Sequence, residues 1–336
     1  MTSENNSLLL NLQEVDKTTG EVVKLDVNST STVQPVALMR LGLFVPTLKS
    51  TGKSKANRKN VTDATEELVQ LSIAKSEGYT DVKITGSRLD MDTDFKVWLG
   101  IIRSMSEYGV KSDTLELSFV EFVKMCGFDS RRSNKKMRDR ISNSLFKLAS
   151  VTLKFQSETK GWTTHLVQSA YYDINEDIVE IKAEPKLFEL YHMDRRVLLR
   201  LKAIDALQRK ESAQALYTYI ESLPPNPAPI SMKRMRDRLN LTSNVYTQNH
   251  TVRKAMEQLR DIGYLDYTEF KRGRATYFSV HYRNPKLISG PVKVPRNEEE
   301  EKAPEQNYDE VIKALKAAGI DPLKLAEALS AMKPEN

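Results

Sequence analysis

The sequence lacks the residues that a disulfide framework, a membrane span or a secretion signal would need. Cys126 is the single cysteine, so no disulfide forms within the chain, and a reducing cytoplasm suits it. Phe122 and Val123 beside it are apolar, which predicts a buried, unreactive thiol. No apolar run approaches the ~18 residues of a membrane helix, and no basic segment precedes residues 8–10. We therefore expect a cytoplasmic protein without a membrane partner.

Histidine is scarce, which bears on one enzymatic alternative, a rolling-circle initiator that nicks DNA with a tyrosine. Such an enzyme holds its metal on paired histidines. The four histidines of this chain stand far apart and form no His-x-His: His165, His192, His250 and His281. Tyr171 and Tyr172 would be the candidate nucleophiles, but they lie in an alternating, strand-like run, where an aromatic side chain usually packs. The nickase is an unfavoured alternative.

Other catalytic and cofactor patterns are missing as well. Gly52-Lys53-Ser54 looks like the end of a phosphate-binding loop, but Thr47 stands where that loop needs its first glycine. No cluster of Cys and His has the spacing of a zinc site. Asp90, Asp92 and Asp94 precede an expected helix, where capping explains carboxylates better than catalysis. We expect no catalytic residue, no metal and no cofactor.

Helical periodicity and a basic hairpin come together between Ala228 and Arg283. A short helix is predicted over 231–241, a polar turn over 242–249, and a second helix over 250–263. The second helix has its apolar positions on one face: Val252, Ala255, Met256, Leu259 and Ile262. Two strand-like runs then enclose a basic turn: Tyr264–Phe270, Lys271-Arg272-Gly273-Arg274 and Ala275–Tyr282. This order predicts a winged helix, whose second helix fits the major groove of DNA.

Charge supports DNA binding by this segment. Between Ala228 and Arg283 the chain has eleven Lys or Arg and five Asp or Glu, a net of +6. The full chain of 336 residues also has a net charge of +6, so the remainder sums to zero. A concentration of basic charge on one unit is typical of nucleic-acid binding. The alternative is an amphipathic helix with a solvated charged face beside an ordinary hairpin.

The same order occurs once before. A short helix is expected over 118–128, a polar turn over 129–133 and a longer helix over 134–148. Three strand-like runs follow and predict a larger wing: Val151–Phe155, Thr163–Tyr172 and Ile178–Ala183. Further helices precede the two copies, over Asp94–Tyr108 and Ser212–Leu223. The expected fold class is α+β, with two tandem winged-helix domains in a pseudo-two-fold relation.

Composition divides the chain into four parts. Residues 1–60 are polar and predict a flexible arm and linker, although Thr32–Lys49 is apolar enough to pack on something. Residues 61–184 are the first winged-helix domain, beginning with a helix over Asp63–Lys75. Residues 185–290 are the second, in which a helix is expected over Val197–Leu207. Residues 291–336 form an acidic linker and a small helical tail.

Several segments resemble one known family. The sequences NSTSTVQPVALMRLGLFVPTLK, RLDMDTDFKVWLGII, ESAQALYTYIESLP and VRKAMEQLRDIGYLDYTEFKRGR resemble the RepFIB-type, iteron-binding plasmid replication initiators, and the match runs from about Val33 to Pro285. The resemblance implies two winged-helix domains that bind short direct repeats, or iterons, in double-stranded DNA at a plasmid origin in a bacterial cytoplasm. It implies that monomers open the origin with the host replication initiator and the replicative helicase. It also implies that dimers repress the protein's own promoter.

A transcriptional repressor without initiator activity is the other alternative, because both functions need the same DNA-reading parts. Arg is the best reader of guanine, since its fork pairs with O6 and N7 together, and other side chains would hold phosphate. Helical phase puts Arg140 nearer the flank, and we rank it lower. The candidate DNA contacts of the first domain are Arg131, Arg132, Asn134, Lys135, Lys136 and Arg138. Those of the second domain are His250, Arg253, Lys254 and Glu257 on the helix, and Lys271, Arg272 and Arg274 on the wing.

Overall fold

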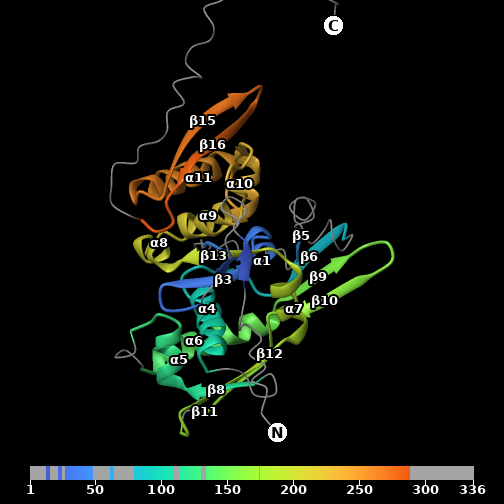
Figure 1. The fold of residues 1–336 in the computed structure, drawn as a ribbon, viewed down its shortest axis with the longest axis vertical. Helices are drawn as coiled ribbons and strands as arrows, with labels where there is room; N and C mark the ends of the chain where they lie inside the picture. The colour runs from blue at the N-terminus through green and yellow to red at the C-terminus, as the bar shows by residue number, and fades with distance from the viewer. Residues whose placement is uncertain are drawn as a thin grey trace, which may run out of the picture. The chain divides into compact units, whose positions relative to one another are not determined.

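The computed structural model describes residues 13–15, 22–24, 27–47, 61–63, 79–108, 114–129, 134–173 and 175–287 (Figure 1). This part of the chain is a mixed α/β structure with one continuous hydrophobic core. The predicted linker and tail, residues 291–336, lie outside it. The predicted helix Asp63–Lys75 also lies outside it, apart from Asp63, which ends a strand. Among the described helices, none has both the length and the apolar character that a membrane span requires.

A helix, a strand, two helices and a hairpin follow one another in the second half of the chain. They are α9 (Glu211–Glu221), β14 (Ile230–Ser231), α10 (Met232–Leu239), α11 (Val245–Asp261), β15 (Leu265–Arg272) and β16 (Ala275–Arg283). β16 lies between β14 and β15 in an antiparallel sheet, and the three helices gather beside it (Figure 1). The predicted apolar face of α11 is confirmed, because Val252, Ala255, Met256 and Leu259 are buried and Ile262 is partly buried.

α11 begins earlier than the sequence predicted. Asn244 caps it by accepting a hydrogen bond from the backbone N–H of Thr247 at 2.9 Å. Val245 is therefore the first helical residue, whereas the prediction began the helix at His250. A capping side chain satisfies an amide that has no partner within the helix, so a polar stretch that resembles a turn can form its first turns. The correction brings Tyr246 into the helix.

The same succession occurs in the first half, with a hairpin inserted. Its elements are α4 (Asp94–Tyr108), β8 (Thr114–Ser118), α5 (Phe119–Met125), α6 (Lys135–Ser150), β11 (Val167–Asp173) and β12 (Ile178–Ala183). β12 lies between β8 and β11, the arrangement that β16 has between β14 and β15. The prediction of a three-run wing was wrong in its first strand and in residues 163–165 of its second run, which pair with that first strand and not with the wing. That strand, β9 (Thr152–Gln156), pairs with β10 (Gly161–His165) and β6 (Asp81–Thr85) in a separate sheet, because alternation marks a strand without identifying its partner.

Matching caps occur in the two copies. Ser118 and Ser231 each cap the shorter helix by accepting a hydrogen bond from the backbone N–H three residues later. Nine residues after each serine the backbone takes a positive φ, at Gly127 (75°) and Asn240 (45°). Each longer helix then begins with an asparagine cap of the same geometry, Asn134 and Asn244. The local chemistry of helix ends therefore repeats where most side chains differ.

Residues 27–47, which the sequence placed in the arm, are folded into the body of the protein. β3 (Ser31–Pro35), α1 (Val36–Arg40) and β4 (Phe44–Val45) are buried along their whole length. β3 pairs with β13 (Arg196–Arg200), and β4 pairs with β7 (Leu89–Asp90). The expectation that this stretch packs on the rest of the chain is confirmed for its described residues. The helix predicted over Val197–Leu207 is wrong in its first part, which is β13. The remaining elements are β1 (Gln13–Val15), β2 (Val22–Lys24), β5 (Val61–Asp63), α7 (Pro185–Met193) and α8 (Leu201–Ala206).

Buried hydrogen bonds fasten the N-terminal strap, residues 31–47, to both halves. Gln34 on β3 accepts a hydrogen bond from the indole N–H of Trp98 on α4 at 2.9 Å. Arg238 on α10 is buried and donates to the backbone carbonyls of Met39 at 3.0 Å and Phe44 at 2.9 Å. Because the strap completes the core of both halves, neither half is expected to keep its structure when the chain is cut between them.

Candidate nucleic-acid interface

The outer face of α11 carries three of the predicted contacts. His250, Lys254 and Glu257 are exposed on the side opposite the buried Val252 and Leu259, as helical phase requires. His250 is a hydrogen-bond donor and Lys254 is a cation, which suits a polyanion. Glu257 is an acceptor, and an acidic side chain in a major groove can take a hydrogen bond from the amino group of cytosine.

Arg253 lies on the flank of α11 and faces the hairpin. Its Nε and Nη2 atoms donate to the carboxylate of Glu269 on β15 over distances of 2.7–3.1 Å. This hydrogen bonding raises the pKa of Arg253 above its ordinary value. Nη1 takes no part in these bonds, so the fork formed by Nη1 and Nη2 can still meet a second acceptor. Arg260, two turns later, donates to the carbonyl of Tyr267 and stacks on its ring at 4.0 Å.

The tip of the β15–β16 hairpin is basic and exposed. Arg272 pairs with Ala275, so Gly273 and Arg274 form a two-residue turn. Gly273 has a φ of +60°, the conformation that glycine adopts without strain at the first position of such a turn. Lys271, Arg272 and Arg274 are exposed around it, as predicted. Three cations on a projecting turn suit contact with phosphate rather than with base edges.

In the first half, α6 presents the predicted residues unequally. Asn134, Lys135 and Lys136 are exposed at its start, and Asn134 also caps the helix. Arg138 instead lies 3.4 Å from the carboxylate of Asp177 and over the ring of Phe119. Its guanidinium therefore helps to hold α6 against the hairpin. Arg131 and Arg132 lie outside the described residues.

Arg140 and Lys147 are partly buried and bind carboxylates at the start of α4. Arg140 donates to Asp92 at 2.6 Å, which agrees with its lower rank. Lys147 lies 3.1 Å from Asp90 and 2.7 Å from Asp94. Burial, with the neighbouring Asp90 charge, raises the pKa of Asp94 to about 6. Asp90 accepts backbone N–H groups at the helix start, so the predicted capping role is confirmed for it.

The hairpin of the first half has an acidic tip, in contrast to the second. Asp173, Glu176 and Asp177 surround the turn between β11 and β12. Tyr171 and Tyr172 on β11 are exposed, so the expectation that they pack in a core is wrong. β11 is the edge strand of its sheet, and an edge strand has one side without neighbours. The acidic tip of this hairpin disfavours contact with phosphate.

The geometry of Tyr171 does not favour a nicking reaction. Its hydroxyl donates to Asp173 at 3.2 Å, and this hydrogen bond raises the pKa of Tyr171. A raised pKa makes the phenolate less available as a nucleophile. Within the described residues, no group of three or more His, Cys, Asp or Glu side chains is placed to hold a metal ion. Cys126 is buried, and burial raises the pKa of its thiol, as the sequence predicted for an unreactive cysteine.

Three exposed apolar side chains on the same two helices were not among the predicted contacts. Val245 and Tyr246 lie in the first turn of α11, and Phe146 lies near the end of α6. The helical phase of Phe146, opposite the buried Ile141 and Leu148, was a signal in the sequence. For Tyr246 the signal was hidden by the misplaced start of α11.

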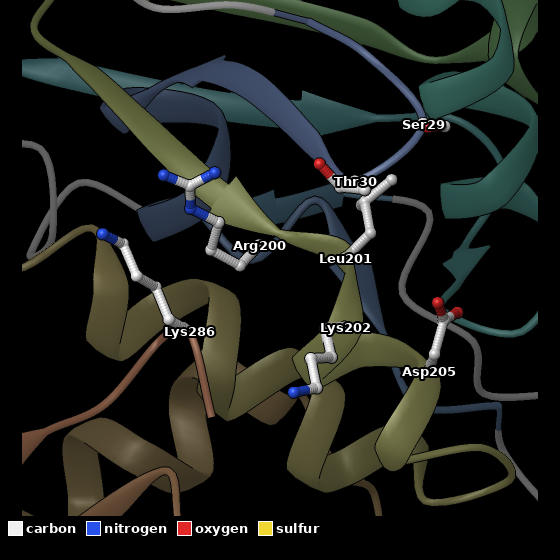
Figure 2. A pocket seen from close by; sticks show the side chains of 7 residues that line it. All are labelled: Ser29, Thr30, Arg200, Leu201, Lys202, Asp205 and Lys286. Carbon is white, nitrogen blue, oxygen red and sulfur yellow. The ribbon is translucent and has the colours of Figure 1, made fainter. Parts of the chain in front are cut away.

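A shallow pocket of about 390 Å³ lies apart from these helices. Figure 2 shows Arg200 and Lys286 on one side of it and Asp205 on the other. Lys202 at its rim donates to the carbonyl of Leu287 at 3.2 Å. The pocket therefore mixes cations with a carboxylate, and at least one of the cations already has a partner.

Comparison with known proteins identifies the family. Residues 92–221 match the family described as "Initiator Replication protein, WH1". RepFIB replication protein A of Salmonella typhi is 58% identical over 291 residues, which cover 85% of this chain and 88% of that protein. Replication protein RepA of Salmonella typhi is 54% identical over 314 residues, which cover 92% of this chain and 90% of that protein.

Among solved structures, domains 2 and 3 of RctB align over 75% of this chain and 98% of that chain, with 13% identity and a TM-score of 0.45. At this TM-score the likeness does not establish a shared fold. The sequence relatives are sufficient, because their identity is high and extends over most of both chains. The chain belongs to the family of RepFIB replication proteins, which are plasmid replication initiators.

Proposed function

We propose that this initiator binds direct repeats at a plasmid origin through two tandem winged-helix domains in a pseudo-two-fold relation. The domains are residues 61–184 and 185–290, and α6 and α11 are their recognition helices. One observation carries the proposal. The order helix, strand, helix, helix, hairpin occurs twice, with the same strand order and the same serine and asparagine caps. Each copy directs the polar face of its longer helix to solvent.

The two recognition helices contact successive major grooves on one face of a single repeat. Helices used in this way sit about one turn of DNA apart, or ~10 base pairs centre to centre. A monomer that engages both helices covers close to two turns. Its affinity exceeds that of either helix alone, because the second contact forms within an already bound complex.

The candidate residues divide between base reading and phosphate contact. We assign base reading to the outer faces of the helices and to Arg253, whose guanidinium keeps one fork for guanine. We assign phosphate contact to Lys271, Arg272 and Arg274. The full set of proposed contacts is Arg131, Arg132, Asn134, Lys135, Lys136, Arg138, His250, Arg253, Lys254, Glu257, Lys271, Arg272 and Arg274. Arg138 ranks lowest because it already binds Asp177.

Membership of the family supports further roles. We propose that the bound protein opens the origin with the host replication initiator and helicase, and that a dimer represses its own promoter. The exposed edge strand β11 supports self-association, because an edge strand can pair with another chain. Repression and initiation need the same two helices.

Footprinting of the DNA that flanks the gene separates the two functions. Several evenly spaced protected repeats are expected for an initiator, whereas one protected palindrome alone favours a repressor.

The test of both helices uses the full chain, because the strap belongs to both halves. Charge reversal at Lys135 and Lys136, or at Lys254, should each weaken binding to one repeat, and each should remove protection over a different groove. Lys186→Glu, on α7, is the matched control and should leave the footprint unchanged. If either change removed protection over the whole repeat rather than over one groove, the two helices would not make independent contacts.

A further inference from the structure

Exposed apolar side chains are concentrated on the two recognition helices. The described part of the chain has six large ones that are exposed: Tyr108, Phe146, Tyr171, Tyr172, Val245 and Tyr246. Two lie on the edge strand β11 and one at the end of α4. The other three lie on α6 and α11. Val245 continues the buried face of Val252 and Leu259, whereas Phe146 and Tyr246 lie off the buried faces of their helices. Core packing therefore does not explain Phe146 and Tyr246.

On α11 the apolar residues occupy the first turn. Val245 is 57% exposed and Tyr246 is 84% exposed, so water surrounds most of an aromatic ring at the start of the helix. The N-terminal residues of a recognition helix are those that contact base edges. Tyr246 and His250 are four residues apart and share one side of the helix, and Lys254 continues the same row. The tyrosine ring is thus the leading member of the proposed DNA-facing row.

On α6 the exposed aromatic residue lies near the end of the helix. Phe146 is 72% exposed and follows Asp139 and Asn143 at helical spacing, with Lys135 one turn before them. All four are exposed. A phenylalanine in a polar row is not part of a contiguous apolar patch, which a protein-docking surface would need. In the α11 row, Lys254 favours a polyanion, whereas in the α6 row Asp139 offsets the charge of Lys135.

We propose that Tyr246 on α11 and Phe146 on α6 contact the 5-methyl groups of thymine in the two major grooves. Thymine is the base that presents an apolar group at the major-groove edge, so an exposed apolar side chain there selects it. The inference rests on the proposed binding of both helices to one repeat. It adds that each half-site contains thymine at positions that these side chains reach.

The experiment replaces each thymine of one footprinted repeat by deoxyuridine, which removes the methyl group and keeps base pairing. Wild-type protein should lose about fourfold in affinity at one or more positions in each half-site, the change that burying one methyl-sized group corresponds to. Tyr246→Ala should weaken binding to the unmodified repeat and abolish the deoxyuridine effect in the α11 half-site. Tyr246→Phe should keep both the affinity for the unmodified repeat and the deoxyuridine effect. Phe146→Ala should abolish the effect in the other half-site, ~10 base pairs away.

Salt dependence separates this contact from phosphate binding. None of these substitutions removes a cation, so the slope of log affinity against log salt should stay unchanged. Tyr108→Ala is the matched control, an exposed tyrosine outside both helices, and should bind like wild type. The side chains are exposed and alanine is a strong helix former, so a circular dichroism melt should show unchanged folding.

Four results would overturn the proposal: deoxyuridine without effect at every position, an effect that persists in the alanine variants, Tyr246→Phe as weak as Tyr246→Ala, or unchanged DNA binding with loss of origin opening. The third result would assign the hydroxyl group to phosphate, and the fourth would assign the side chains to a protein partner. If no repeat is protected at all, the proposed function fails instead.

Discussion

Replacing Arg253 by alanine tests whether the best-placed arginine of α11 reads a base or holds the hairpin. Its guanidinium binds Glu269 through Nε and Nη2, and the fork of Nη1 and Nη2 is left for a further acceptor. We expect Glu269 to orient Arg253 for that second contact. Arg253→Ala should then cost about 1–3 kcal/mol in binding to the cognate repeat and much less on random duplex.

The structure limits how much of this cost can come from the protein alone. The Arg253 side chain is 43% exposed and that of Glu269 is 31% exposed, so water and salt screen their attraction. Such a pair contributes about 0.2–1 kcal/mol to folding. A decrease in binding above that range cannot arise from a loosened hairpin and must come from contact with DNA.

The assay is a double-mutant cycle on cognate and random duplexes. Glu269→Gln keeps the shape of the side chain and removes its charge, so it should cost specific affinity, but less than Arg253→Ala does. The double variant should bind no more weakly than Arg253→Ala, because the orienting group then has nothing to orient. Leu259→Ala is the stability control: it should lower the free energy of unfolding by about 2–5 kcal/mol, because the residue is fully buried. Equal decreases on both duplexes would make Arg253 a phosphate contact, and tighter binding by Glu269→Gln would show that Glu269 competes with DNA.

Three further outcomes are expected. Neutralising Lys271, Arg272 and Arg274 together should weaken binding to every sequence similarly. The slope of log affinity against log salt should become shallower by roughly 0.9 for each phosphate that is no longer bound, and an unchanged slope would contradict the phosphate role. Arg238→Met should lower the free energy of unfolding in urea by about 1–3 kcal/mol, because buried carbonyls of the strap lose their donor, whereas the exposed Lys233→Met should have little effect. Burial raises the pKa of Asp194 to about 6, so its contribution to stability is full below about pH 4 and declines as the pH rises through 6. Asp194→Asn should remove this part of the pH dependence of Tm, and a pH profile identical to that of the wild type would refute the assignment.

The second half was predicted well because its signals are local. The spacing of Val252, Met256 and Leu259 determines which face of α11 is buried, and the basic turn at Gly273 determines where the hairpin reverses. Both signals depend on residues that are close together in the chain. The start of α11 was misjudged because residues 242–244 favour turns and helix caps alike, and the hydrogen bond from the Thr247 backbone is what distinguishes the two.

The errors in the first half concern pairing over long distances. β9 joins β6, about seventy residues earlier, and β13 joins β3, which is more distant still. Strand alternation contains no information about such partners, so β9 was assigned to a wing and β13 to a helix. The error over the strap has the same cause. The apolar residues of β3 and α1 showed that the stretch packs, but they did not show against which half.

The net charge overstates how many basic side chains can contact phosphate. The segments Ala228–Arg283 and Arg131–Lys147 each have a net charge of +6, yet several of their cations act inside the protein. Arg238 and Arg283 donate to backbone carbonyls, and Arg140 and Lys147 bind aspartates at the start of α4. Only cations that meet phosphate release counterions and enter the salt slope. The first hairpin adds an acidic tip, so in the proposed complex the electrostatic share of binding falls mainly to the second hairpin, the start of α6 and Lys254 on α11. We therefore expect a salt slope smaller than the count of basic residues, with sequence selection left to the few side chains that are proposed to face the grooves.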